Sequence, residues 1–268
     1  FFCFSIANFL LFATSEQLQS NPKPYCVPNQ HQGTSLSGPL NKMSKKSPEN
    51  IVILGGGIIG TSIAYHLAKR GVPSTVVERT KIGAAASGKA GGFLAGGWGD
   101  GSETEQLHRV SFRMHEELAR DLGIKSFRKI QTLNVQGGTP RRGSKPVPPV
   151  SWLDGEITKA SVMDTATAQV TPLELTEAFM ASAIAGGARL RIGRAESVRF
   201  EERGGARHVS AVIVDGEVIP CDCLVVAMGP WSCIAAEWFG TPIPMEGVKS
   251  ASVIYRHPEG GAHVDQPA

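Results

Sequence analysis

Four residues near the start of the patterned part of the chain have the types and spacing to bind a dinucleotide. Gly55, Gly57 and Gly60 form the pattern G-x-G-x-x-G, and Glu78 follows about 20 residues further on. In such a pattern the first glycine permits a tight turn, the second lets a pyrophosphate approach the backbone, and the third lets a helix pack against a strand. Glu78 can accept hydrogen bonds from a ribose 2′-hydroxyl and would repel a 2′-phosphate, which disfavours NADP.

The elements needed to position these residues are visible in the hydrophobic pattern. Residues 51–54 are continuously apolar, as expected of a parallel strand that is buried on both faces. Ile59, Ile63 and Leu67 recur at intervals of four, which predicts a helix whose apolar stripe faces the sheet. Residues 74–78 form a second apolar run that ends at Glu78. Strand, turn, helix and strand therefore occur in the order that makes the glycine pattern specific.

A second stretch rich in small residues follows soon after Glu78. Residues 88–101, "GKAGGFLAGGWGDG", have glycine at half of their positions but include Phe93, Leu94 and Trp98, which a flexible linker seldom contains. A nicotinamide enzyme has no need of a second small-residue cradle at this point. A longer, fused-ring cofactor that lies across the sheet does need one.

The segments "VVERTKIGAAASGKAGG" and "CLVVAMGPWS" resemble the FAD-dependent amine and amino-acid oxidoreductases, the group of D-amino-acid oxidase, glycine oxidase and monomeric sarcosine oxidase. The resemblance implies an α/β fold, in which a Rossmann-like FAD-binding domain with a β-meander crossover accompanies a partial α+β substrate domain. It covers about residues 50–255. FAD is the expected cofactor and a small-molecule amine or amino acid the expected substrate.

The motif and the resemblance together predict a set of cofactor-binding residues. Ser87 to Gly92 would run along the flavin end, the backbone at Ala195 would face the adenine, and small residues near Ala227 would let the chain pass under the cofactor. We predict no metal site and assign no catalytic acid or base, and we interpret Arg113 and His115 as surface residues of a helix over residues 103–122. The predicted FAD contacts are Gly55, Gly57, Ile58, Ile59, Gly60, Glu78, Arg79, Ser87, Gly88, Lys89, Ala90, Gly91, Gly92, Ala195, Ala227, Gly229 and Trp231.

The middle of the chain contains further β-like runs and one strong helix start. We expect a strand over residues 126–135, whereas residues 157–170 lack a clear period. Thr171 as N-cap, Pro172 at the first position and Glu174 closing a capping box predict a helix that leads into a third parallel strand.

The following three β-like runs are joined by turn signals and end in a strand with the small-residue sequence Ala227-Met228-Gly229. This β-meander favours an FAD fold over a nicotinamide-binding fold, in which a helix is more usual.

These observations predict a discontinuous domain organisation. Residues 50–125 and 171–240 would form the two parts of the FAD-binding domain, and residues 126–170 part of the substrate domain. Residues 241–268 would begin a second substrate-domain segment that the sequence truncates, because the family that the chain resembles continues further. We therefore expect the chain as written to lack activity.

The first 49 residues are expected to form a disordered leader or targeting segment. The chain begins with an apolar stretch, residues 1–13, that is too short to span a bilayer, which needs about 20 residues. We expect translation to start naturally at Met43. The predicted location is cytoplasmic, or organellar if residues 1–42 are a genuine targeting segment.

Composition excludes some classes of function. The net charge is +3 over 268 residues, with a surplus of two positive charges in residues 1–50 alone. The nearly neutral remainder lacks the basic face expected for nucleic-acid binding. Five cysteines, an odd number without framework spacing, favour a reducing compartment. The sequence does not determine the oligomeric state.

The leading functional hypothesis is a flavoenzyme that oxidises the C–N bond of an amine or amino acid by hydride transfer to the flavin. Two alternatives stay open at this point. The first is a catalytically silent flavin-binding scaffold or trafficking protein, which nothing in the sequence excludes. The second is an NAD-dependent dehydrogenase, which the β-meander and the second glycine cradle disfavour.

Overall fold

The computed structural model describes residues 48–139, 153, 156–245, 247 and 249. The expected leader over residues 1–42 and most of the segment 241–268 lie outside the described residues. Within the described part, no helix has both the length and the apolar character needed to cross a membrane.

A four-stranded parallel sheet forms the centre of the fold. Its strands are β1 (Ile51–Leu54), β2 (Ser74–Glu78), β6 (Arg189–Ile192) and β10 (Cys223–Val226), in the spatial order β10-β1-β2-β6. The first two strands have the bounds that the sequence predicts, and the expected third parallel strand after the middle helix is β6. The predicted α/β architecture is therefore confirmed.

The central strands are apolar throughout because both faces of this sheet are covered. Side chains alternate along a strand, so Ile51 and Ile53 contact the helices while Val52 and Leu54 contact the antiparallel strands on the other face. All four are at most 5% exposed. Removing this much apolar surface from water is the main stabilising contribution to the sheet.

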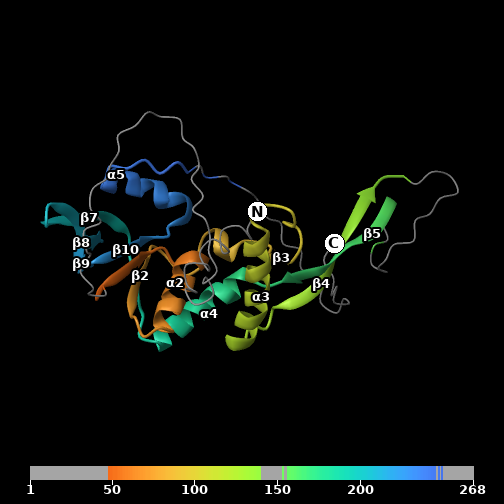
Figure 1. Ribbon diagram of the computed structural model, residues 1–268, viewed down its shortest axis with the longest axis horizontal. Helices are drawn as coiled ribbons and strands as arrows, with labels where there is room; N and C mark the ends of the chain where they lie inside the picture. The colour runs from red at the N-terminus through yellow and green to blue at the C-terminus, as the bar shows by residue number, and fades with distance from the viewer. Residues whose placement is uncertain (1–47, 140–152, 154–155, 246, 248, 250–268) are drawn as a thin grey trace.

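Helices cover one face of the sheet. Helix α2 (Ile58–Ala68) packs against α4 (Pro172–Ala185), and α3 (Glu105–Asp121) lies beside them (Figure 1). The expected apolar stripe of α2 is only partly buried. Its most buried face includes Ile58, Thr61 and Tyr65 instead. The reason is that α2 is enclosed by both the sheet and α4, so burial follows two contact faces rather than one periodic stripe.

A β-meander covers the opposite face. Strands β7 (Ala195–Arg203), β8 (Ala206–Val214) and β9 (Glu217–Pro220) form an antiparallel sheet in sequential order. The chain then returns to the parallel sheet as β10 and continues into the short helices η3 (Gly229–Ile234) and α5 (Ala235–Phe239). The meander and α5 lie together at one end of the molecule (Figure 1). This crossover confirms the expectation from the three β-like runs.

The third sheet differs in two respects from what the sequence predicts. β3 (Phe93–Ala95) lies inside the glycine-rich stretch, and β5 (Ile157–Gln169) forms a long strand where the sequence shows no period; with β4 (Arg128–Gly137) they have the order β3-β5-β4. β4 and β5 project as an arm (Figure 1). Burial along β5 does not alternate, because backbone pairing rather than one buried face holds this strand.

The N-terminus of α4 is anchored differently from the predicted capping box. Thr171 is the N-cap but makes no side-chain cap hydrogen bond, and its N–H donates to the Ser126 hydroxyl at 2.8 Å. The Glu174 carboxylate accepts hydrogen bonds from the N–H groups of Lys125 and Ser126 at 2.8 and 3.1 Å. The capping box is thus wrong, since Glu174 binds the loop before β4 instead of its own helix.

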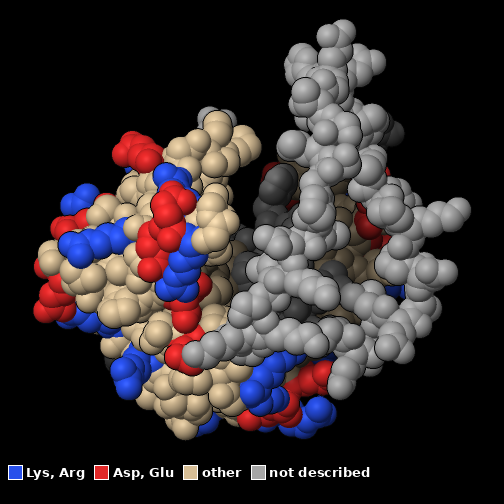
Figure 2. All heavy atoms as spheres, turned by 60° about the vertical axis from the view of Figure 1, so that its left-hand side comes forward, with Lys and Arg blue, Asp and Glu red and all other residues tan. Residues whose placement is uncertain are grey.

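On the face of the molecule in Figure 2, Lys and Arg side chains lie among Asp and Glu side chains, with no broad area of one sign. Ion pairs between described residues include Arg191 with Glu217 and Lys129 with Glu116, both at 2.8 Å. They are solvent-exposed, so each contributes little to stability.

Candidate cofactor site

The turn between β1 and α2 contains three glycines with different physical roles. Gly55 has a φ of +108°, and a Cβ there would overlap the carbonyl oxygen of Ala227. A Cβ at Gly60 would overlap the carbonyl oxygen of Gly55. The fold itself therefore requires glycine at these two positions.

Gly57 is different because the protein leaves space beside it. Its backbone is extended, with φ −79°, and a Cβ there would meet only the Ser87 hydroxyl oxygen, at 3.2 Å. Among the described residues no backbone atom would overlap this Cβ, and only the Ser87 hydroxyl would have to shift slightly to admit it. The space next to Gly57 is therefore available to a ligand that must approach the backbone closely, as a pyrophosphate does.

The N-terminus of α2 supplies hydrogen-bond donors at this space. The N–H of Ile58 donates to Ser87 Oγ at 2.9 Å. The N–H groups of Gly57 and Ile59 have no hydrogen-bond partner among the described residues. Free N–H groups and the helix dipole give this end a partial positive charge, which favours an anion such as a diphosphate.

Glu78 lies on the other side of the same turn. Its Oε2 accepts a hydrogen bond from the N–H of Gly56 at 2.8 Å, and its Oε1 accepts one from the N–H of Thr80 at 3.0 Å. The carboxylate is therefore held beside the glycine turn. That is the place from which the carboxylate of a dinucleotide-binding fold contacts a ribose.

The second motif of the resemblance comes to the same edge of the sheet. The N–H of Ala227 donates to the carbonyl of Leu54 at 2.8 Å, and Gly229 has a φ of +56°. The guanidinium of Arg79 lies 5.0 Å from the ring centroid of Trp231. Arg79 and Trp231, far apart in the sequence, are thus brought into contact where β2 and β10 end.

Ala195 lies at the start of the meander, where it pairs with Val214 and packs against the core between the meander and the parallel sheet. The adenine contact of Ala195 stays a prediction.

Contacts within the protein explain why several positions after Glu78 are glycine. A Cβ at Gly88 would overlap the carbonyl oxygen of Gly83, and a Cβ at Gly92, whose φ is +74°, would overlap that of Val170. A Cβ at Gly96 would lie 2.9 Å from the carbonyl oxygen of Ala166. Close approach of β5 and of neighbouring turns therefore explains much of the glycine that the sequence alone attributes to a cofactor.

Other positions of this segment leave room for a ligand. Gly91 has no such overlap with the backbone of another element, because a Cβ there would only reach the Phe93 ring at 3.7 Å. Lys89 is exposed at the end of the short helix η2 (Ala86–Gly88). The flavin contacts of Ser87 to Gly92 stay a prediction that these positions permit.

A small apolar cavity of about 30 Å³ lies between the glycine-rich segment and the helices. Residues of the predicted site line it together with residues that the sequence analysis did not select. The latter come from β3, from the helix α3 and from the start of α4, which only the fold brings together. The lining residues are Ile58, Ser87, Ala90, Gly92, Phe93, Leu94, His115, Val170, Pro172 and Leu175.

His115 corrects one sequence-based interpretation. It is 3% exposed and lines the cavity, whereas the sequence places it on the helix surface; Arg113 is exposed as expected. Its Nδ1 hydrogen-bonds the carbonyl of Ser111 at 2.8 Å. Burial lowers the pKa of His115 because the interior disfavours the charged ring. The amphipathic pattern of α3 does not show that its polar face also contacts other elements.

The glycine turn, the Glu78 carboxylate and the space beside Gly57 are features of dinucleotide-binding families in general. Comparison with known proteins identifies the family of this chain. Residues 50–267 match the family described as DAO, FAD dependent oxidoreductase. The chain belongs to this family. FAD is therefore its cofactor, and the glycine turn with its open space and positive helix end fits the diphosphate of FAD.

The individual relatives of this FAD-dependent oxidoreductase have low sequence identity to it. The probable oxidoreductase OrdL of Rhizobium meliloti is 26% identical over 271 residues, which cover 85% of this chain and 60% of OrdL. A solved structure of glycine oxidase from Bacillus cereus ATCC 14579 matches with a TM-score of 0.59 and 24% identity, and covers 71% of this chain and 58% of that one.

A solved structure of L-proline dehydrogenase from P. horikoshii matches with a TM-score of 0.58 and 23% identity, over 72% of this chain and 56% of that one. At these identities the two solved structures establish the fold. The chain spans less than two thirds of the length of each of these three relatives.

The described residues contain no group of three or more His, Cys, Asp or Glu side chains that could hold a metal ion. The described cysteines Cys221, Cys223 and Cys233 are not in disulfides. Burial, with the negative charge of Asp222, raises the pKa of Cys221 to about 11, so this thiol stays protonated and unreactive at neutral pH.

Proposed function

We propose that the protein oxidises the C–N bond of a small amine or amino acid, with FAD as the acceptor of the hydride. FAD supplies the redox chemistry when bound, and the residues of the protein bind it and orient it. The observation that carries this proposal is the open space beside Gly57, flanked by Glu78 and Ser87, in a chain of the FAD-dependent oxidoreductase family.

Each part of the turn has a proposed role toward the cofactor. The N–H groups at the start of α2 bind the diphosphate, because they have free donors and a partial positive charge. Glu78 binds the adenosine ribose. Arg79, which follows Glu78 in the chain, contacts Trp231 of η3, and we assign both residues to the border of the same part of the site. The remaining predicted contacts follow the chain from Ser87 to Gly92.

The substrate class is supported by what the relatives are named. Glycine oxidase and L-proline dehydrogenase act on amino acids, according to their names, and share this fold. They also differ in being an oxidase and a dehydrogenase, so the fold does not distinguish these two reactions. We propose the oxidation of an amine or amino acid without choosing between oxygen and another electron acceptor.

Spectroscopy of the purified protein tests this function. The protein should show the visible absorbance of oxidised flavin, and candidate amines and amino acids added without oxygen should bleach it, because the reduced flavin loses this absorbance. A flavin that no substrate of a broad panel bleaches would favour the silent flavin-binding scaffold. Protein that purifies without flavin and does not take up FAD would contradict the proposed function in either form.

A further inference from the structure

Three residues on neighbouring strands of the third sheet form one row across it. Gln169 of β5 pairs with Phe93 of β3 on one side and with Arg128 of β4 on the other. Residues that pair directly across strands lie on the same face, with Cβ atoms about 5 Å apart. The side chains of Phe93, Gln169 and Arg128 therefore project from one face of this sheet, although the three residues are far apart in the sequence.

Hydrogen bonds through Gln169 connect this row to the glycine-rich segment. An N–H of the Arg128 guanidinium donates to Gln169 Oε1 at 2.8 Å, and Gln169 Nε2 donates to the carbonyl of Gly91 at 3.2 Å. Gly91 belongs to the segment that we expect to follow the flavin. The guanidinium therefore extends over β5 toward this segment, and both polar groups of the Gln169 amide contribute to holding it there.

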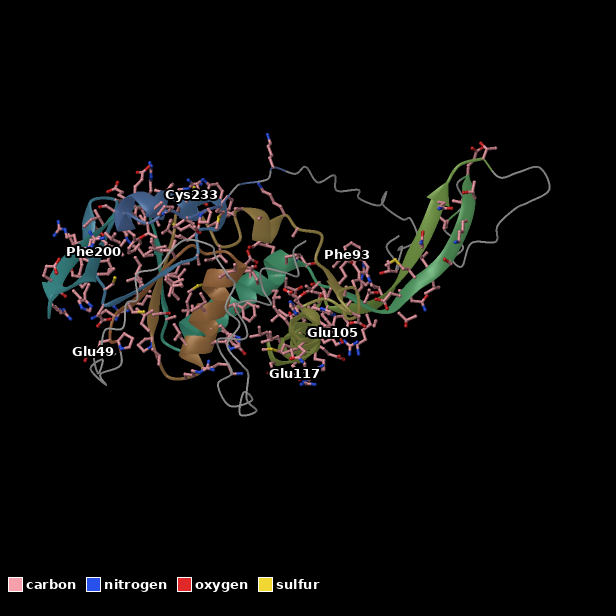
Figure 3. All side chains as sticks on the ribbon, turned by 45° about the horizontal axis from the view of Figure 1, so that its top comes forward. Glu49, Phe93, Glu105, Glu117, Phe200 and Cys233 are labelled. Carbon is pink, nitrogen blue, oxygen red and sulfur yellow. The ribbon has the colours of Figure 1, made fainter. Side chains whose placement is uncertain are left out.

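The ring of Phe93 lies at the border of the same segment. A Cβ at Gly91 would reach this ring at 3.7 Å, and the ring lines the cavity together with Ser87. Phe93 is nevertheless 43% exposed, and it lies far from Phe200 and Cys233 at the meander end (Figure 3). Because a substrate must contact the flavin to be oxidised, an exposed ring beside the flavin segment borders the substrate as well.

Arg128 is the cation of this row, and its side chain is exposed. Apart from the bond to Gln169, its guanidinium makes no hydrogen bond or ion pair with another described residue. It therefore keeps donors for a ligand, and a guanidinium can bind a carboxylate through two parallel hydrogen bonds. Lys129, the next residue, points to the other face of β4 and forms an ion pair with Glu116 of α3 at 2.8 Å. Of these two adjacent cations, Arg128 alone belongs to the row.

We propose that Arg128 binds the carboxylate of an amino-acid substrate and that Phe93 contacts an apolar side chain of the same molecule. An amino acid carries its carboxylate and its side chain on one carbon atom, so a cation and an aromatic ring on the same face recognise it at two points. Gln169 is a positioning residue, because it acts through Arg128. This inference rests on the proposed function and narrows its substrates to amino acids with an apolar side chain.

The binding of three small probes to the FAD-loaded protein tests this proposal. The probes are 3-phenylpropionate, 3-phenylpropionamide, which lacks the charge, and propionate, which lacks the ring. None of them carries an amine that could be oxidised. Calorimetric titration gives the dissociation constant of each probe. We expect 3-phenylpropionate to bind more tightly than either of the other two by a factor on the order of ten, because each of them loses one of the two contacts.

Each substitution in the row should remove one of these two preferences. Phe93→Ala should lose the preference for the ring and keep that for the charge, and Arg128→Gln should do the reverse. Gln169→Leu should reduce the preference for the charge and keep that for the ring, which a general disturbance of the sheet would not do. Phe200→Ala at the meander end and Lys129→Gln on the other face of β4 are the matched controls and should keep both preferences.

Two results would overturn the proposal. The first is a wild-type protein that binds the three probes equally, a result that needs no variant to fold. The second is a variant, Phe93→Ala or Arg128→Gln, that keeps both preferences or loses both together, because the row would then not recognise two separate groups. No probe is oxidised in these titrations. Their failure would therefore leave the proposed oxidation standing, and a flavin that no amine bleaches would leave the titrations interpretable.

Discussion

Ser87 Oγ accepts a hydrogen bond from the N–H of Ile58 at 2.9 Å, and this contact joins the glycine-rich segment to the first turn of α2. Ser87 is 9% exposed and Ile58 is 5% exposed, so solvent cannot easily replace either partner. Gly57 is the N-cap residue of α2 but has no side chain that could accept a hydrogen bond. Ser87 Oγ partly replaces that missing cap.

Ser87→Ala should lower the free energy of unfolding by about 1 to 3 kcal/mol, because the buried N–H of Ile58 would lose its acceptor. Denaturant titration measures this change. Ser161→Ala, on the exposed part of β5, is the control and should change the stability by less than about 0.5 kcal/mol. If both variants were equally stable, the contact between Ser87 and Ile58 would not contribute to the fold.

Gly57→Ala should keep the fold and lose most of the affinity for FAD. A Cβ at Gly57 meets only Ser87 Oγ, at 3.2 Å, but occupies the space that the diphosphate needs. Thermal unfolding of the apo-protein and titration with FAD measure the two effects separately.

Two other glycines provide the comparison for that variant. Gly55→Ala should destabilise the apo-protein itself, because its Cβ would overlap the carbonyl oxygen of Ala227. Gly187→Ala, at a φ of +95° with open space around it, should affect stability more than FAD binding. FAD affinity that is equal in Gly57→Ala and Gly187→Ala would place the diphosphate elsewhere.

Glu78→Gln should weaken FAD binding by about 1 to 3 kcal/mol, the range for hydrogen bonds to a charged group. The neutral amide would be a weaker acceptor for a ribose hydroxyl, and it would also weaken the bond from the N–H of Gly56. Titration of apo-protein with FAD provides the measurement, with Glu177→Gln on the exposed face of α4 as control. Unchanged affinity would remove Glu78 from the ribose site.

Glu174 should make the stability depend on pH in the acidic range. The Ser126 hydroxyl and the N–H groups of Lys125 and Ser126 donate to its carboxylate and lower its pKa from the ordinary value of 4.5. Its contribution is therefore complete above pH 4.5 and is lost as the pH falls through the folded-state pKa.

The melting temperatures of the wild-type protein and of Glu174→Gln, measured at several pH values, test this dependence. The wild-type protein should be the more stable one at neutral pH, and the difference should shrink below pH 4.5. The effect should be small, because Glu174 is only partly buried and solvent screens its charge. A difference that is constant with pH would mean that the charge of Glu174 does not matter.

Residues 51–78 show how much local sequence can determine. Two apolar runs, three spaced glycines and one carboxylate predict strand, turn, helix and strand, because each of these signals acts between residues close together in the chain. The meander is predictable for the same reason, since turn residues separate its strands. The domain boundaries and the expected start at Met43 stay predictions.

Contacts between segments that are far apart in the sequence were decided only by the tertiary structure. The roles of Gly55 and Gly92 depend on the carbonyls of Ala227 and Val170, which the chain brings near from far away. Glu174 binds another loop instead of its own helix, and His115 is buried although its helix is amphipathic. Local propensity cannot predict such contacts, because their energies come from groups that become neighbours only when the sheets and helices pack.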